Sequence, residues 1–138
     1  MQTKREIGAA EASMAVDLIA SELKRRGKAA VIAVADSHGE LIALLRCDGA
    51  PFSCIAIATN KAFTAARERK PSGDLGRSSR ADGWDFSYLG DPRYVGWDGG
   101  IPVVIGGEVV GAVAVSGLSG EEDAELASMA AKKIAAST

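Results

Sequence analysis

A glycine pair between two runs of apolar residues is the feature that most constrains the fold of this chain. Gly106 and Gly107 separate the apolar residues 102–105 from the largely apolar residues 108–115. A two-residue turn between antiparallel strands needs positive φ angles, which glycine adopts without steric cost. The pattern therefore predicts a β-hairpin with strands at Pro102–Ile105 and Glu108–Val115.

A second strand pair is expected earlier in the chain. Residues 30–35 form a continuous apolar run, and residues 41–45 are apolar again. The intervening Asp36-Ser37-His38-Gly39 is typical of a tight turn. Apolar residues occupy both alternating sets in these strands, which predicts a sheet that is covered on both faces.

Three segments have apolar residues at helical spacing. The first runs from Lys4 to Arg26, and the second from Pro51 to Arg69. The third begins after Ser119, which we expect to form a capping box with Glu122. Two hairpins and three helices predict one α+β domain over the whole chain of 138 residues, with helices on an antiparallel sheet.

The stretch from about Pro71 to Pro102 has neither a helical nor a strand period, so we expect an irregular loop. A structureless stretch this long in a small domain is usually functional. Aromatic side chains suit a ligand pocket or a subunit interface, and the alternative is a loop that covers only the domain's own core. Five of the chain's seven aromatic residues lie here: Trp84, Phe86, Tyr88, Tyr94 and Trp97.

Charge and composition argue against several classes of partner. The formal net charge is −2, so no basic field is available to neutralise nucleic-acid phosphates. No apolar run reaches the length of a membrane span, and the polar N-terminus does not resemble a secretory signal. We therefore expect a cytoplasmic protein without nucleic-acid or membrane partners. Cys47 and Cys54 fit neither a disulfide framework nor a common zinc spacing, so we expect free thiols and no metal site.

Three blocks of the sequence resemble the GlcG/HbpS-like family, which includes the C-terminal domain of PduO-type proteins. They are AVADSHGELIALLRCDGA, ATNKAFTAA and GGIPVVIGGEVVGAVAVSGLSGEEDAELA, and the resemblance covers roughly residues 31–130. It implies an antiparallel sheet with helices on both faces, in a profilin-like or Roadblock-like three-layer architecture. It also implies a homo-oligomer and, for some members, haem binding or haem degradation.

Haem is a cofactor that the resemblance allows and the residues do not favour. Haem iron usually takes an axial ligand from His, Cys, Met or Tyr. Haem-binding relatives carry a ligating histidine on the N-terminal helix, and the corresponding helix here has none. The single histidine, His38, falls in the expected turn, where a solvated turn residue is the simpler interpretation. Met14, Tyr88 or Tyr94 could substitute in principle.

Three polar residues in the family blocks are candidate catalytic groups. Arg46 and Asp48 follow a strand, and Lys61 borders the apolar side of the second helix. The planar guanidinium of Arg46 suits a carboxylate, and a desolvated Lys61 would be a better base or Schiff-base amine. The alternatives are structural: an Arg46–aspartate pair that fixes the turn, and an ion pair of Lys61 with Asp48 or with a neighbouring subunit.

Candidate ligand-binding residues come from the aromatic stretch. Backbone N–H groups of Gly99 and Gly100 could bind an oxyanion, or these glycines could serve only the bend into the second hairpin. Trp84, Tyr94 and Trp97 would supply aromatic contacts. We therefore predict one cleft, closed by a neighbouring subunit and lined by Arg46, Asp48, Lys61, Trp97 and Gly100.

Two functions remain open from the sequence. One is a cofactor-independent enzyme of the lyase, isomerase or hydratase type, or an accessory protein, acting on a small carboxylated or aromatic metabolite in a catabolic pathway. The other is binding of haem or another tetrapyrrole without catalysis, which the family resemblance implies.

Overall fold

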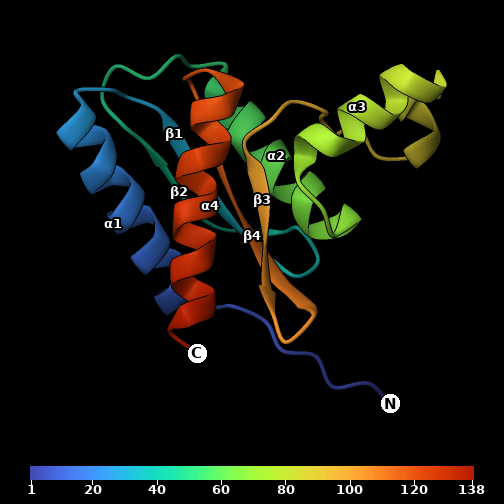
Figure 1. Cartoon of the computed structure of the whole chain (residues 1–138), viewed down its shortest axis with the longest axis horizontal. Helices are drawn as coiled ribbons and strands as arrows, with labels where there is room; N and C mark the ends of the chain where they lie inside the picture. Colours follow the sequence, from blue (N-terminus) through green and yellow to red (C-terminus); the bar gives the residue numbers. More distant parts are fainter.

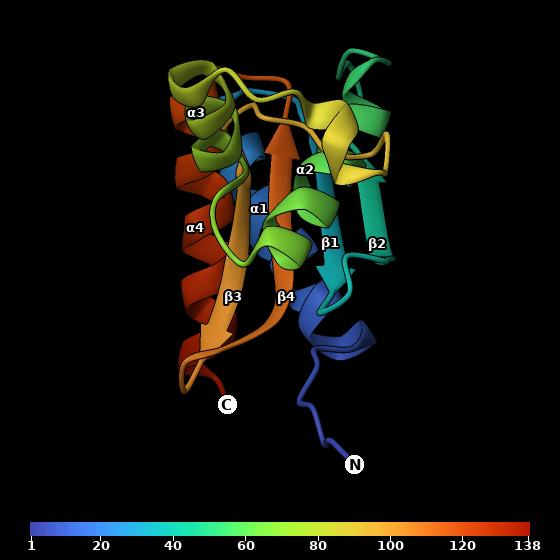
Figure 2. The same ribbon diagram turned by 90° about the vertical axis from the view of Figure 1, so that its right-hand side faces the viewer.

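Four antiparallel strands form the central layer of this protein, and helices cover both faces (Figures 1 and 2). The computed structural model describes all residues from 1 to 138. This arrangement confirms the predicted α+β fold. The elements in chain order are α1 (Ala9–Arg26), β1 (Val31–Asp36), β2 (Leu41–Arg46), α2 (Cys54–Glu68), α3 (Ser72–Asp82), η1 (Phe86–Leu89), β3 (Gly100–Ile105), β4 (Glu108–Ser116) and α4 (Gly120–Ala136).

Both predicted hairpins form, and they join through their inner strands. The order in the sheet is β2-β1-β4-β3, with β1 paired to β2, β4 paired to β3, and β1 paired to β4. Gly106 and Gly107 have φ angles of 57° and 81°, as a tight turn between antiparallel strands requires. The two edges of the sheet are therefore β2 and β3.

The alternation of side chains in β1 explains why all its residues are apolar. Ile32 and Val34 belong to the core that packs with α1 and α4, whereas Val31, Ala33 and Ala35 belong to the core beneath α2. Figure 2 shows the four strands side by side, with α2 in front of the sheet and α1 and α4 behind it. None of the helices is both long enough and apolar enough to cross a bilayer.

Helix α1 begins later than predicted. Ile7 stays extended and donates its N–H to the carbonyl of Val110 at 2.9 Å, so it packs into the core beside β4. Gly8 then caps the helix, and its N–H donates to the Glu11 carboxylate at 2.7 Å. Helix α1 therefore begins at Ala9 rather than at the predicted Lys4. The buried residues of α1 are Ala12, Ala15, Ile19 and Leu23.

The prediction of an irregular loop over residues 71–102 is wrong, because α3 and η1 lie within it. They form an arm, residues 72–90, that projects beyond the three layers (Figure 1). The sequence of α3 hides this helix, since it has two glycines and few apolar residues. Tertiary packing stabilises it instead: Leu75 is buried, and the backbone at Gly76 lies directly against Gly96.

A cluster of charges joins the end of α1 to the start of α4. Ser119 caps α4 by accepting the N–H of Glu122 at 3.1 Å, as predicted. The Glu122 carboxylate does not complete the capping box, because it accepts hydrogen bonds from Arg26 at 3.0 Å and Lys28 at 2.6 Å. These two cations lower the pKa of Glu122, with Lys28 contributing most.

Replacing Arg26 should weaken this junction. Arg26→Ala removes ion pairs to three carboxylates. The pKa of Glu122 is lowered from 4.5 in the folded state. The ionised Glu122 carboxylate therefore stabilises the folded state above its unfolded-state pKa, and this stabilisation is lost as the pH falls through its folded-state pKa. We expect Arg26→Ala to lower the thermal midpoint at pH 7. Below pH 4.5, the midpoint of this variant should fall less steeply with decreasing pH than that of the wild type.

The matched control is Arg80→Ala, which removes an exposed arginine that forms no ion pair. Thermal melts followed by circular dichroism at several pH values measure both variants. Equal midpoints and equal pH profiles for Arg26→Ala and Arg80→Ala would contradict the expectation.

Candidate functional site

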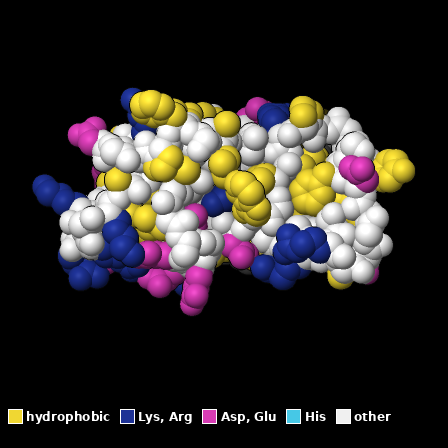
Figure 3. Space-filling view, turned by 90° about the horizontal axis from the view of Figure 1, so that it is seen from above, with side chains coloured by type: hydrophobic (Ala, Val, Ile, Leu, Met, Phe, Trp, Pro, Cys, Tyr) yellow, Lys and Arg dark blue, Asp and Glu magenta, His cyan; other side chains and the backbone are white.

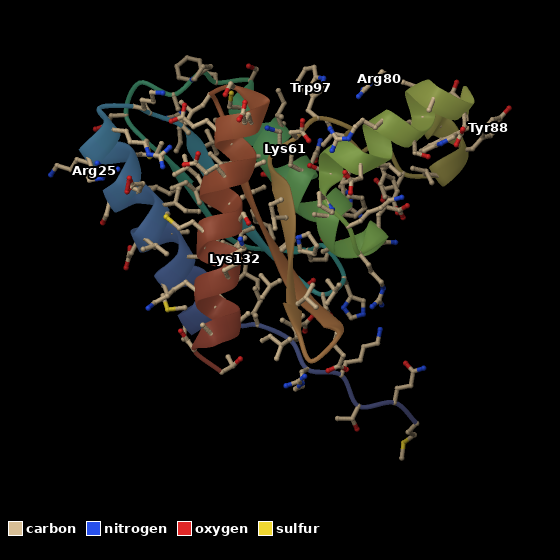
Figure 4. The ribbon with its side chains drawn as sticks, viewed as in Figure 1. Arg25, Lys61, Arg80, Tyr88, Trp97 and Lys132 are labelled. Atoms are coloured by element: carbon tan, nitrogen blue, oxygen red, sulfur yellow. The ribbon has the colours of Figure 1, made fainter.

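A cleft of about 480 Å³ opens where the sheet ends and α4 begins. Its walls come from the start of α2, the Trp97–Asp98 segment before β3, the end of β4 and the first turn of α4. Figure 4 shows Lys61 and Trp97 near one another at this end. Seen from above, hydrophobic side chains there lie beside acidic and basic ones (Figure 3). Such a mixture is usual in small-molecule sites.

Lys61 is the buried cation of this cleft. Helix α2 places it on the side that packs against β4, and only 3% of the residue is exposed. Its Nζ donates to the carbonyl of Val115 at 3.0 Å and to the Asp123 carboxylate at 3.1 Å. The ion pair that we considered between Lys61 and Asp48 is therefore replaced by a pair with Asp123.

Asp123 holds the junction between β4 and α4. It lies in the first turn of α4 and is 2% exposed. Besides Lys61, it accepts the N–H of Leu118 at 3.1 Å. Burial raises the pKa of Asp123, and the nearby Lys61 ammonium opposes that shift. The pair thus connects α2, the end of β4 and α4 at one point.

Asp123 was not among the predicted site residues, although the sequence contains a signal for it. It belongs to an acidic run, Glu121–Asp123, which is explained as well by the positive end of the helix. Asp123, Leu126, Ala130 and Ile134 nevertheless follow helical spacing, and all four are buried. An acidic residue in phase with the apolar side of a helix predicts a buried partner of opposite charge.

The structure brings Lys61, Trp97, Gly99 and Gly100 together. Trp97 lies at the rim with 62% of its surface exposed, whereas both glycines are buried. An added Cβ would lie 2.7 Å from the Lys61 Nζ at Gly99 and 2.3 Å from the Lys61 carbonyl oxygen at Gly100. These two positions therefore need glycine because the chain passes so close to Lys61.

Arg46 and Asp48 do not line this cleft, which corrects their predicted place in it. Both are exposed, and the Arg46 guanidinium lies 5.3 Å from the centre of the Phe52 ring. The strand order is the reason. Arg46 ends β2 and Asp48 follows it. Since β1 and β4 separate β2 from β3, the start of β3 lies at the opposite side of the sheet.

Trp84 and Tyr94 also lie outside the cleft. Trp84 stacks on Phe86 within the arm, with ring centres 5.1 Å apart, and its Nε1 donates to Ser78 at 3.1 Å. Tyr94 packs edge-on against Phe63, with ring centres 5.1 Å apart. It also lines a separate hollow of about 430 Å³ with Phe86. Both aromatics therefore stabilise the arm and its contact with α2.

One group of side chains could converge on a metal ion. Ligand atoms of Glu6, Asp36 and His38 lie within 4.8 Å of one another. His38 is exposed in the β1–β2 turn, and its Nδ1 lies 3.5 Å from the Glu6 carboxylate. Since Val31 pairs with Ser116 and Asp36 pairs with Gly111, this group lies at the opposite end of the sheet from the cleft.

The Lys61–Asp123 pair should behave as a unit when it is mutated. Asp123→Leu leaves the Lys61 ammonium buried without its partner, so we expect a loss of about 3–5 kcal/mol in the free energy of unfolding. The double variant Lys61→Met/Asp123→Leu removes both charges and should be more stable than Asp123→Leu alone. Urea denaturation measures both, and equal stabilities for the single and double variants would contradict the coupling.

Comparison with known proteins gives the family of this chain. Residues 7–132 match the family model described as "Haem degrading protein HbpS-like". Protein GlcG of Escherichia coli K12 is 34% identical over 116 residues, which cover 84% of this chain and 85% of GlcG.

Solved structures agree with this assignment. Klebsiella pneumoniae protein ORFY is 27% identical with a TM-score of 0.89, covering 99% of this chain and 95% of its own. A double mutant of Streptomyces reticuli HbpS is 25% identical with a TM-score of 0.86, covering 96% of this chain and 90% of its own. The predicted resemblance is thereby confirmed, and this chain belongs to the HbpS-like family.

Proposed function

We propose that this protein acts on a small carboxylated or aromatic metabolite that binds in the cleft beside Lys61. The observation that carries the proposal is an unused hydrogen-bond donor. A lysine ammonium has three donors, and Val115 and Asp123 take two of those of Lys61. The third belongs to a buried cation that lines an open cleft, where a carbonyl or carboxylate oxygen of a ligand would satisfy it.

The walls of the cleft support a partly apolar ligand. Ile57, Trp97 and Leu118 line it together with the polar groups. An exposed indole at the rim offers a large flat surface on which a ring or a planar carboxylate can pack. The combination of an apolar wall and few convergent polar groups is typical of a site for a small molecule.

The same geometry supports a catalytic role without a cofactor. An ammonium held by a carboxylate stabilises negative charge that develops on a bound carbonyl oxygen, which helps removal of a proton from the adjacent carbon. Asp48, one of the predicted catalytic groups, lies outside the cleft, but Asp98 lines it and would accept that proton. Arg77 pairs with Asp98 at 3.1 Å and keeps that carboxylate at the rim. We propose a lyase or isomerase reaction of this type.

Haem binding is the second candidate, favoured by the family match. The cleft itself does not fit haem. Among its lining residues, Cys54 is the one side chain of a type that commonly ligates haem iron. Cys54 is itself buried, with 7% of its surface exposed, so its thiol is poorly accessible to haem iron. A haem site would therefore lie elsewhere on the surface or between copies.

Ligand binding can be tested with benzoate, benzaldehyde and pyruvate as probes of three ligand types. In ¹⁵N-labelled protein, we expect at least one probe at millimolar concentration to shift the indole N–H signal of Trp97. The indole of Trp84 serves as an internal reference, because it donates to Ser78 away from the cleft. The double variant Lys61→Met/Asp123→Leu should weaken the response by about tenfold or more.

Two results would contradict the proposal. One is that no probe shifts the Trp97 signal, and the other is an equal response in wild type and double variant. Addition of hemin is the second arm of the experiment. A Soret band with wild-type protein, together with silent small-molecule probes, would favour the haem alternative.

We also propose that copies of this chain associate in the cytoplasm. Both edge strands carry exposed apolar side chains, with Leu41 and Leu45 on β2 and Val104 on β3. Phe52 and Trp97 are exposed beside the cleft, at 78% and 62%. An edge strand with exposed apolar side chains offers unpaired backbone groups and apolar surface to a second copy.

Self-association predicts a sedimenting mass above the 14.2 kDa of one chain. Analytical ultracentrifugation at micromolar concentration measures it. Leu45→Ser should shift the distribution toward the monomer, whereas Tyr88→Ser, which changes an exposed side chain of the arm, should not. A monomer for the wild type at this concentration would overturn the proposal.

A further inference from the structure

A single buried hydroxyl holds the turn that carries Trp97. Ser72, the first residue of α3, is fully buried. Its Oγ donates to the carbonyl of Trp97 at 2.6 Å and accepts the N–H of Gly100 at 2.9 Å. The two hydrogen bonds tie both ends of residues 97–100 to one atom, so the turn keeps its shape only while α3 stays in place.

Close backbone packing adds a second restraint from α3. An added Cβ at Gly76 would lie 2.1 Å from the carbonyl oxygen of Gly96, and one at Gly73 would lie 1.7 Å from the Asp98 carboxylate. The segment on either side of Trp97 therefore rests directly on the helix. Substitution of either glycine by a larger residue requires this segment to move.

Trp97 itself adds little to the core of the domain. Its side chain is 62% exposed and forms no aromatic pair, unlike Trp84 and Tyr94. One buried and one partly buried hydrogen bond, together with two glycine contacts, nevertheless fix the backbone on which it stands. Restraint of an exposed side chain at the rim of a cleft is what a preorganised binding surface requires.

From this geometry we infer that Ser72 is a positioning residue, which fixes Trp97 at the rim and thereby sets the width of the cleft for a flat ligand. The role of Ser72 rests on the proposed function only in one respect, which is that the ligand is a small carboxylated or aromatic metabolite. The placement of Trp97 by α3 is a property of the protein without ligand.

The test measures Trp97 alone, in a Trp84→Phe background, by fluorescence anisotropy and acrylamide quenching without ligand. Ser72→Ala removes both hydrogen bonds, so we expect the quenching constant of Trp97 to rise by about twofold or more as the turn loosens. Ser79→Ala is the matched control. The Ser79 hydroxyl, on the same helix, donates to the carbonyl of Trp84 at 2.7 Å. Ser79→Ala therefore removes a hydrogen bond of the same kind away from Trp97.

Two further variants separate positioning from general damage to the fold. Ser72→Thr keeps the hydroxyl and should restore the wild-type quenching constant. Gly76→Ala leaves Ser72 intact but displaces Gly96, so it should also raise the quenching constant of Trp97. This variant replaces Ser72→Ala in the test if Ser72→Ala is too unstable to measure. Circular dichroism reports whether each variant is folded. Quenching that is equal in wild type, Ser72→Ala and Gly76→Ala would overturn the inference.

Benzoate titrations then distinguish this inference from the proposed function. One outcome is that Ser72→Ala raises the quenching constant of Trp97 while the wild type binds no benzoate. This outcome would support the positioning role of Ser72 and count against benzoate-like ligands. Benzoate that binds wild type and Ser72→Ala with equal affinity, despite a looser Trp97, would overturn the role of Ser72 in setting the cleft.

Discussion

The rest of the structure depends on one buried ion pair, between Lys61 of α2 and Asp123 of α4. The two helices cover opposite faces of the sheet, so their charges can meet only beyond the end of a strand. That strand is β4, in which the carbonyl of Val115, the residue before the last, accepts a hydrogen bond from the same Lys61 ammonium. Apolar side chains of similar volume would often stabilise such a junction equally well. Stability alone therefore does not account for two buried charges, and the chemical role that we propose for them rests on their place in the lining of the cleft.

The antiparallel order brings the necessary segments to this end of the sheet. The end of β4 and the start of β3 lie there because these two strands are antiparallel, and the first turns of α2 and α4 lie beside them. The N-terminus of a helix carries a partial positive charge, which favours carboxylates such as Asp123 in its first turn. The backbone of α4 thus contributes a fixed positive potential at this end of the sheet, independently of the side chains that line the cleft.

How far the sequence predicts this arrangement depends on which interactions are local. The hairpins follow from the Gly106-Gly107 turn and from apolar residues in both alternating sets, so the layers could be predicted. The order in which the hairpins join is not a local property. Had β2 paired with β3, Arg46 would have ended beside Gly100, as predicted; pairing of β1 with β4 separates them. Asp123 was not predicted as a buried partner of Lys61, because the positive end of the helix already explains an acidic residue at this position.

Helix α3 shows how a weak local signal can serve a precise tertiary contact. Glycine destabilises a helix interior by about 1 kcal/mol relative to alanine, and α3 contains two such residues in eleven. At Gly73 and Gly76 a side chain would collide with the segment that carries Trp97. The arm is therefore stable only when it is docked, and its docking fixes the rim of the cleft. The stability of the arm and the shape of the cleft are thus coupled, because the same backbone contacts determine both.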